Sequence, residues 1–367
     1  MAEKKLGISP DLLIHPGETI SDLLEERGIT QKELAQRAGV SEAFLSDVIH
    51  GKKDISRSLA KGFEYALGVP ASFWLNLQAN YDAELMSVQE ESSVLTEEKA
   101  VLSNIHEIVH YLKKKAVLAD DSTKEDMVIR LRKLFRVSRL TGLKELVPAG
   151  AFRMSDKVSV NEDVLGAWLC LCQKKCSERE INSVFDPEQI GDLVSELKTV
   201  MCANERDLPK KLTQVLAEYG ICFNLVHNFR GAPVHGYIER KEDQTYQMVL
   251  TLRGAYADIF WFSLFHELGH IVNGDLGRSG SLIDVQDSKD QRREEQADLF
   301  AGNALLEPES YQQFVRMQSY TYAMIREYAK SQQVPPYIVI GRLQKEERIP
   351  WNRFQNYKLR YKWADQA

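Results

Sequence analysis

Over about the first 80 residues, apolar positions recur at helical spacing in short segments separated by tight turns. "SDLLEERG" ends at Gly28, a favoured residue just after a helix. "TQKELAQRAG" follows, with Thr30 as its N-terminal cap and Glu33 as the second half of a capping box. After a glycine, Ser41 caps the next segment, "SEAFLSDVIHGKK". Two helices joined by a short turn predict a helix-turn-helix domain, which we place at residues 1–85.

After residue 85 the chain continues with helical segments, and segments with the composition of strands appear later. Residues 86–145 are strongly charged and carry apolar stripes at helical spacing, so we expect a helical connector there. Residues 146–367 begin with helical segments, and then "GICFNLVHN", "APVHGYIE" and "YQMVLTLRG" have the composition of strands. A long apolar helix follows, then a polar loop over 273–290 and a helix at "EEQADLFAGNALL". The pattern predicts a mostly helical α+β chain with a small β-sheet in its C-terminal domain.

The long apolar helix contains residues that a buried helix rarely carries. In "FSLFHELGHIVNGD", His266 and His270 are one helical turn apart, so both can bind one tetrahedral ion. Glu267 can reach a water molecule held by that ion and accept its proton. H-E-x-x-H on a helix is the metalloprotease signature for that reason. The spacing predicts a zinc (Zn²⁺) site with Glu267 as general base, and a purely structural role for the three residues is the alternative.

A catalytic zinc site needs a third protein ligand. The following helix offers Glu294, Glu295 and Asp298, of which Glu294 and Asp298 share a face. We expect Glu294 to complete the ligand set and Asp298 to hydrogen-bond a ligand histidine from outside it, which fixes the tautomer of that histidine. Glu295 is the second choice as ligand.

A peptidase also needs a hydrogen-bond donor for the oxyanion of its tetrahedral intermediate. His235, Tyr237 and Arg253 lie close to the motif in sequence order. The sequence does not choose among them, because a core tyrosine or a structural ion pair is the more ordinary role for each.

Composition narrows the class of protein. With 367 residues, 44% of them hydrophobic, the chain is long enough for two or three packed domains. The net charge of −6 argues against non-specific coating of nucleic acid, and five cysteines argue against a secreted disulfide framework. The sequence starts without a signal-peptide core and has no apolar run of about 18 residues. We expect a cytoplasmic protein without a membrane span, with Cys170, Cys172 and Cys176 as buried thiols.

The region around the motif resembles the ImmA/IrrE metallopeptidase domain. The resemblance covers about residues 220–308 and rests on "LTLRGAYADIFWFSLFHELGHIVNGD" followed by "EEQADLFAGNALLEP". It implies a zincin fold with His266, His270 and Glu294 as zinc ligands and Glu267 as base. It also implies a regulatory peptidase that cuts one or a few protein substrates, often a repressor.

The N-terminal region resembles the HigA-like antitoxin branch of the repressor-type (XRE) helix-turn-helix proteins. The resemblance covers about residues 14–81, including "HPGE" and the "GVS…L…I…G" frame. It implies a homodimer that binds a palindromic operator through the second helix of the pair. The DNA-contacting candidates are Gln31, Lys32, Arg37, Ser41, Glu42, Ala43, Ser46, Asp47, Lys52 and Lys53.

The charge balance of this region leaves a second interpretation open. Residues 1–90 contain nine lysines and arginines against fourteen acidic residues, and Glu42 and Asp47 stand where basic or amide side chains are usual. A helix-turn-helix kept for dimerisation or protein docking is therefore the alternative to DNA binding.

Taken together, these two resemblances imply an antitoxin and transcriptional regulator of a toxin–antitoxin module. Its expected partners are operator DNA, a cognate toxin encoded by a neighbouring gene, and a specific protein substrate cut by the zinc-dependent peptidase domain. The alternative is a catalytically silent zincin domain that serves as a toxin-binding module on an autorepressor.

Overall fold

The computed structural model describes residues 13–120, 122–147, 160–177, 181–203, 207–276, 280–285 and 291–363. The chain divides into two compact units. The N-terminal unit comprises residues 1–99 and 113–130, and the C-terminal unit comprises residues 100–112 and 131–367. The segment expected to be a connector is helical, and its residues are divided between the two units. Among the described helices, none has both the length and the apolar content that crossing a membrane requires.

The N-terminal unit is built from helices whose ends the sequence encodes locally. The Thr30 side chain accepts a hydrogen bond from the Glu33 N–H, and the Ser41 side chain accepts one from the Phe44 N–H, both at 3.2 Å. Gly28 ends its helix in the left-handed region, at φ 61°. These predicted ends are confirmed. The helices are α1 (Pro16–Arg27), α2 (Gln31–Ala38), α3 (Glu42–Ile49), α4 (Arg57–Leu67) and α5 (Ala71–Glu90).

The core of this unit lies between α1 and α5. Ile20, Leu34, Leu45, Phe63 and Trp74 are completely buried and belong to one cluster. The approach of α1 to α3 requires a glycine in α1, since a Cβ on Gly17 would lie 2.0 Å from the Ile49 carbonyl oxygen. The packed pair α2–α3 is the helix-turn-helix that the sequence predicts.

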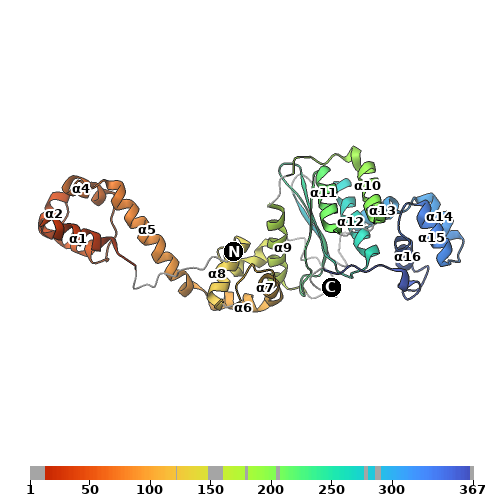
Figure 1. Cartoon of the computed structure of the whole chain (residues 1–367), viewed down its shortest axis with the longest axis horizontal. Helices are drawn as coiled ribbons and strands as arrows, with labels where there is room; N and C mark the ends of the chain where they lie inside the picture. Colours follow the sequence, from red (N-terminus) through yellow and green to blue (C-terminus); the bar gives the residue numbers. More distant parts are fainter. Residues whose placement is uncertain are drawn as a thin grey trace. The chain divides into compact units, whose positions relative to one another are not determined.

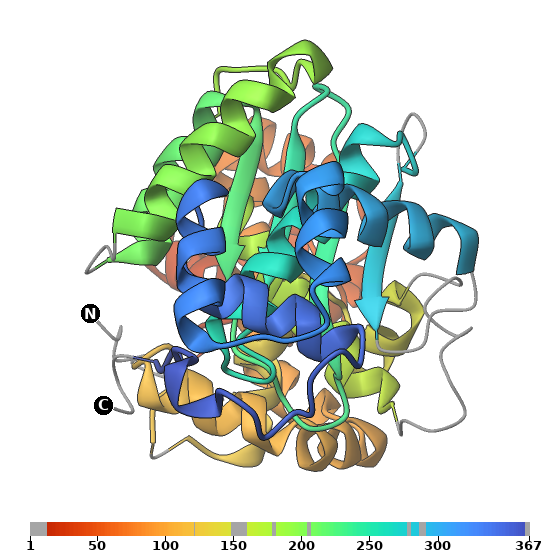
Figure 2. The same ribbon diagram turned by 90° about the vertical axis from the view of Figure 1, so that its right-hand side faces the viewer.

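The C-terminal unit contains a four-stranded mixed sheet in the order β1-β3-β2-β4. Strand β1 pairs parallel with β3, and β2 pairs antiparallel with both β3 and β4. Figure 2 shows β1 (green) at one edge and β4 (cyan) at the other. The strands are β1 (Ile221–Leu225), β2 (Val234–Arg240), β3 (Tyr246–Leu250) and β4 (Ser281–Val285).

Three of these strands confirm the prediction, whereas β4 lies within the segment expected to be a polar loop, 273–290. That expectation was wrong for Ser281–Val285 because a five-residue strand gives little periodic signal. The strand forms by pairing with β2, and its partner is remote in sequence.

Helices cover both faces of the sheet (Figure 1). On one face Phe223, Ile238 and Met248 pack into a cluster that includes residues of α10, α11 and α12. On the other face the Gln247 side chain donates a hydrogen bond to the Cys172 carbonyl of α9 at 2.8 Å. Because both faces are covered, β3 is buried at all five positions.

The remaining helices complete the two units. They are α6 (Thr96–Asn104), α7 (His106–Lys114), α8 (Lys124–Phe135), α9 (Glu162–Ser177), α10 (Ile190–Ala203), α11 (Leu208–Glu218), α12 (Ala257–Val272), α13 (Gln291–Leu305), α14 (Pro308–Arg316), α15 (Tyr322–Ser331) and α16 (Pro336–Lys345). Short 3₁₀ turns lie at Glu91–Ser93, Leu140–Leu146, Pro187–Gln189 and Gln355–Tyr357.

Candidate metal centre

Helix α12 places the motif residues in the interior of the C-terminal unit. His266, Glu267 and His270 are 6%, 0% and 2% exposed, respectively. The next helix, α13, can approach closely because Gly269 faces it: a Cβ there would lie 3.0 Å from the Cα of Ala297. This close contact brings the acidic first half of α13 beside the two histidines.

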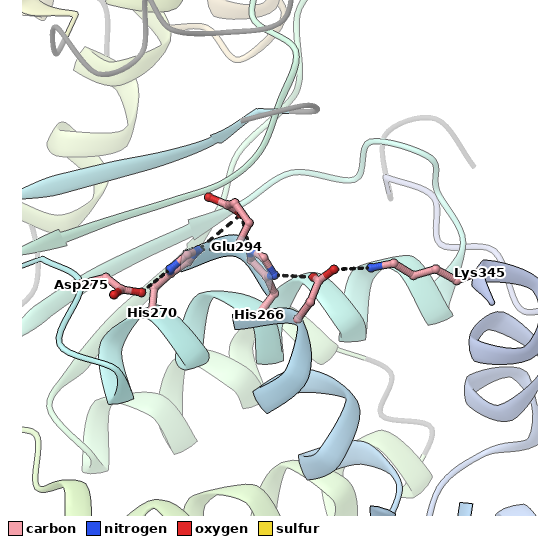
Figure 3. A network of polar contacts seen from close by, with 6 residues as sticks. His266, His270, Asp275, Glu294 and Lys345 are labelled. Carbon is pink, nitrogen blue, oxygen red and sulfur yellow. Dashed lines mark hydrogen bonds and ion pairs between the residues drawn. The ribbon is translucent and has the colours of Figure 1, made fainter. Parts of the chain in front are cut away.

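Three side-chain atoms of the predicted ligand set converge between α12 and α13 (Figure 3). The Nε2 atoms of His266 and His270 are 3.1 Å apart. Glu294 Oε2 lies 3.1 Å from Nε2 of His266 and 3.7 Å from Nε2 of His270. Two neutral imidazoles and a carboxylate therefore direct their lone pairs at one point.

Carboxylates outside this set fix the tautomer of each ring. His266 Nδ1 lies 2.9 Å from Asp298 Oδ1, and His270 Nδ1 lies 2.8 Å from Asp275 Oδ2. Since a carboxylate only accepts, each Nδ1 carries the proton and each Nε2 is left as a donor of electrons to a metal. Lys345 of α16 donates to the second oxygen of Asp298 at 2.9 Å and holds that carboxylate in place (Figure 3).

The distances match what a tetrahedral ion demands of its ligands. Ligand bonds of about 2.0–2.1 Å at tetrahedral angles put neighbouring ligand atoms about 3.3 Å apart. The three observed separations, 3.1, 3.1 and 3.7 Å, scatter around that value. The nitrogen and oxygen donors suit Zn²⁺, which binds such His-His-Glu sets in hydrolases. The residues present therefore fit the ion.

The electrostatics of the centre favour positive charge at the same point. Burial alone would raise the pKa of Glu294, but its close contacts with His266 and His270 outweigh burial and hold that pKa well below its usual range. For His270, burial alone would lower the pKa, but the contact with Glu294 and the charge of Glu267 raise it above its usual value. Both shifts show that the site favours positive charge, which a divalent cation would supply.

The predicted base, Glu267, lies against strand β2. A Cβ added to Gly236 would come within 1.8 Å of Glu267 Oε1, so the strand and the carboxylate are in direct contact. The sequence did not assign a role to Gly236. The strand is irregular at this point, because its register with β4 shifts between Val234 and Gly236.

This contact predicts the effect of Gly236→Ala. The added methyl group must displace either the Glu267 carboxylate or the strand, so the hydrolysis that the sequence predicts should fall on the order of 100-fold. Zinc content, measured by elemental analysis, should not change because no ligand is touched. Gly191→Ala is the control, since a Cβ there meets no atom within 4 Å. Full activity of Gly236→Ala would show that the carboxylate is not held where the structure has it.

The three candidate oxyanion donors lie in different surroundings. Tyr237 is buried on the sheet face opposite α12, where it contacts Trp168 and donates to Glu239 at 3.0 Å. Arg253 donates to the Pro233 carbonyl. Of the three, only His235 lines the cavity that His266 and Glu294 also line.

Two further outcomes concern acidic residues near the centre. Glu295, the second choice as ligand, is exposed and lies outside the converging set. Asp275 was not assigned from the sequence, although it follows His270 by only five residues. An acidic residue just after the end of the motif helix is a signal that could have identified it.

The helix-turn-helix places most of its candidate DNA contacts at the surface. Lys32, Arg37, Ser41, Glu42, Ala43, Lys52 and Lys53 are exposed, and Gln31, Ser46 and Asp47 are half-buried. Ser41 serves as the cap of α3, and Arg37 pairs with Glu33. Asp47 pairs with Lys53 at 3.1 Å, which offsets part of its negative charge.

Comparison with known proteins identifies the class of this unit. Residues 20–74 match the helix-turn-helix family. Virulence-associated protein A' of Dichelobacter nodosus is 38% identical over 76 residues, which are 20% of this chain and 66% of that protein. The chain thus spans just under two thirds of that relative's length. The N-terminal unit therefore carries a helix-turn-helix domain of the XRE type.

Solved antitoxin structures are similar to 22–23% of the chain. A putative antidote protein of a plasmid maintenance system from Nostoc punctiforme is 38% identical and covers 22% of this chain and 89% of its own, with a TM-score of 0.20. The antitoxin HigA of Pseudomonas aeruginosa, solved with the higBA promoter, is 29% identical. The similarity covers 22% of this chain and 89% of that one, with a TM-score of 0.21. A HigA-family antidote protein from Coxiella burnetii is 25% identical. The similarity covers 23% of this chain and 96% of that one, with a TM-score of 0.20. The family match ends at residue 74, before the candidate metal centre.

Proposed function

We propose that the chain is an antitoxin-type transcriptional regulator whose C-terminal unit is a zinc-dependent peptidase of the ImmA/IrrE type. The observation that carries the peptidase is the convergence of two imidazole nitrogens and one carboxylate oxygen beside a second, fully buried carboxylate, Glu267. A structural zinc site closes its ion with four protein ligands, whereas three ligands leave a position for a reactant. Within the described residues, His266, His270 and Glu294 are the set that meets these distances.

Each side chain has a definite part in the proposed hydrolysis. A zinc ion at this site would lower the pKa of water and polarise the substrate carbonyl. Glu267 accepts the proton of the attacking water and then delivers it to the leaving amine. Asp298 and Asp275 keep the histidine tautomers that leave both Nε2 atoms available as ligands.

His235 is the proposed donor to the developing oxyanion, because it lines the same cavity and directly precedes Gly236, which lies against the base. His235→Ala should lower kcat on the order of 100-fold, with little change in KM or zinc content, since the hydrogen bond forms only as charge develops. His235→Gln, which keeps an N–H, should restore part of the rate. Equal loss in both variants, or loss through KM alone, would argue against the assignment.

The peptidase proposal can be tested with the protein encoded beside this chain. The zinc-loaded full chain is incubated with that neighbouring gene product, and both proteins are examined by mass spectrometry for new termini. A discrete cleavage product supports the proposal. If neither protein is cut while the partner is still bound and neutralised, the C-terminal unit is a binding module, and the peptidase proposal fails.

For the N-terminal unit we propose operator binding as a dimer, with a cognate toxin as protein partner. The helix-turn-helix family supports this, and the exposed lysines after α3 can hold phosphates. The acidic residues of α3 are the feature that opposes it. A binding assay on the DNA upstream of the gene therefore decides between a DNA-reading and a docking helix-turn-helix.

The salt dependence of that assay gives a sharper prediction. If Lys52 neutralises one phosphate, Lys52→Ala should reduce the slope of log affinity against log salt by about 0.9. Lys330→Ala, an exposed lysine of the other unit, is the control and should leave the slope unchanged. An unchanged slope in Lys52→Ala, measured by titration at several salt concentrations, would remove this lysine from the interface.

A further inference from the structure

A groove of about 650 Å³ opens from the metal centre between α12, α13 and α16. We call it the α12–α16 groove. His266 and Glu294 line it, as do Phe262 and Ile259, which precede His266 on α12. Its volume is that of a site for a sizeable ligand. Any peptide positioned for hydrolysis at the centre therefore has this groove beside the bond that is cut.

The walls of the groove are largely apolar. Leu305, Leu306 and Ile338 line it and are buried, and the side chains of Leu299 and Trp351 line it while remaining 61% and 60% exposed. Large apolar side chains exposed at the edge of a cavity gain free energy when a ligand covers them. Gly302 also lines the groove and leaves space where another residue would project a side chain.

Most of the charged groups along the groove are engaged with one another; Glu295 also lines the groove and is exposed. Lys345 donates to Asp298, and Arg342 donates to Glu346 and to the Gly302 carbonyl. The buried carboxylate of Asp258 pairs with Lys358 at 2.6 Å. A charged substrate side chain would have to compete with these pairs, whereas an apolar side chain leaves them intact.

We propose that the α12–α16 groove binds a bulky apolar side chain of the substrate next to the scissile bond, so that the peptidase selects leucine, phenylalanine or a similar residue there. This inference rests on the proposed function and adds the substrate class. Continuity with the metal centre identifies the occupant, since His266, Glu294 and Asp298 line both.

The test uses binding as well as turnover. Two short peptidyl hydroxamates, identical except for a leucine or a glycine beside the zinc-binding group, are titrated into the zinc-loaded full chain by calorimetry. The leucine compound should bind on the order of 10- to 200-fold more tightly, which is the range that apolar pockets provide. A glutamate compound should bind no better than the glycine one.

Gly302→Leu fills the groove and should reduce the preference for leucine about tenfold. The atoms nearest to a Cβ at Gly302 belong to the end of the flexible Arg342 side chain, at 3.4 Å, so the variant is expected to fold. Gly191→Leu makes the same change on α10, where a Cβ meets nothing within 4 Å, and should leave the preference unchanged. Leu299→Ser, at the exposed edge of the groove, is the second variant if Gly302→Leu does not fold, and it should weaken leucine binding several-fold.

The outcomes separate this inference from the proposed function. Equal binding of the leucine and glycine compounds, or a preference that folded Gly302→Leu or Leu299→Ser leaves unchanged, would overturn the inference. Failure of every hydroxamate to bind would overturn it together with the metal centre. A leucine preference without cleavage of any peptide in a randomised mixture would support the groove and contradict the peptidase.

Discussion

Glu267→Gln should abolish most hydrolysis while leaving zinc in place. The amide keeps the size of the side chain but cannot accept a proton, and general-base catalysis contributes about 10²- to 10⁴-fold to such reactions. The three atoms that converge on the ion belong to other residues, so metal content by elemental analysis should equal that of the wild type. The measurement is the rate at which the neighbouring gene product, or a cleaved peptide from a randomised mixture, gives its products.

A matched variant tests whether a loss of activity in Glu267→Gln has a cause other than loss of the base. Glu309→Gln makes the same chemical change on an exposed residue of the same unit outside the cavity, and it should retain near wild-type activity. An unchanged rate in Glu267→Gln would remove the base from the mechanism. Equal loss in both variants would mean that a general effect of the change, rather than loss of proton transfer, lowers the rate.

His270→Ala should release the ion. Two ligands remain, and even the loss of a hydrogen-bond partner outside the ligand set costs about 10- to 100-fold in metal affinity. We therefore expect zinc affinity to fall by more than about 100-fold, with hydrolysis lost in parallel. Competition with a zinc chelator followed by elemental analysis measures this.

His110→Ala is the control for His270→Ala, because His110 is an exposed histidine of the same unit. It should retain the wild-type metal content. Stoichiometric zinc in His270→Ala after the same chelation would contradict the ligand assignment.

The features that the sequence predicted depend on residues within one or two helical turns of each other. The caps at Thr30 and Ser41 depend on an N–H three residues away. His266 and His270 share a face because one helical turn separates them. Placing Glu294 beside the two histidines required a second helix. The spacing of Glu294 and Asp298 on one face of that helix was the sequence signal for this placement.

The features that escaped prediction depend on tertiary contacts. Strand β4 exists by pairing with β2, and Gly236 matters because Glu267 of another element lies on it. Lys345 reaches Asp298 from a helix 47 residues further along the chain. Neither periodicity nor residue type reports such contacts, because the partners are far apart in sequence and are brought together only by tertiary packing.

Zinc-edge X-ray absorption on the purified, zinc-loaded chain tests the central claim most directly. We predict a coordination shell of nitrogen and oxygen atoms only, with the outer-shell signal of two imidazoles, and loss of one imidazole in His270→Ala. Sulfur neighbours at about 2.3 Å, or a spectrum that His270→Ala leaves unchanged, would show that the ion is bound elsewhere and would contradict the account.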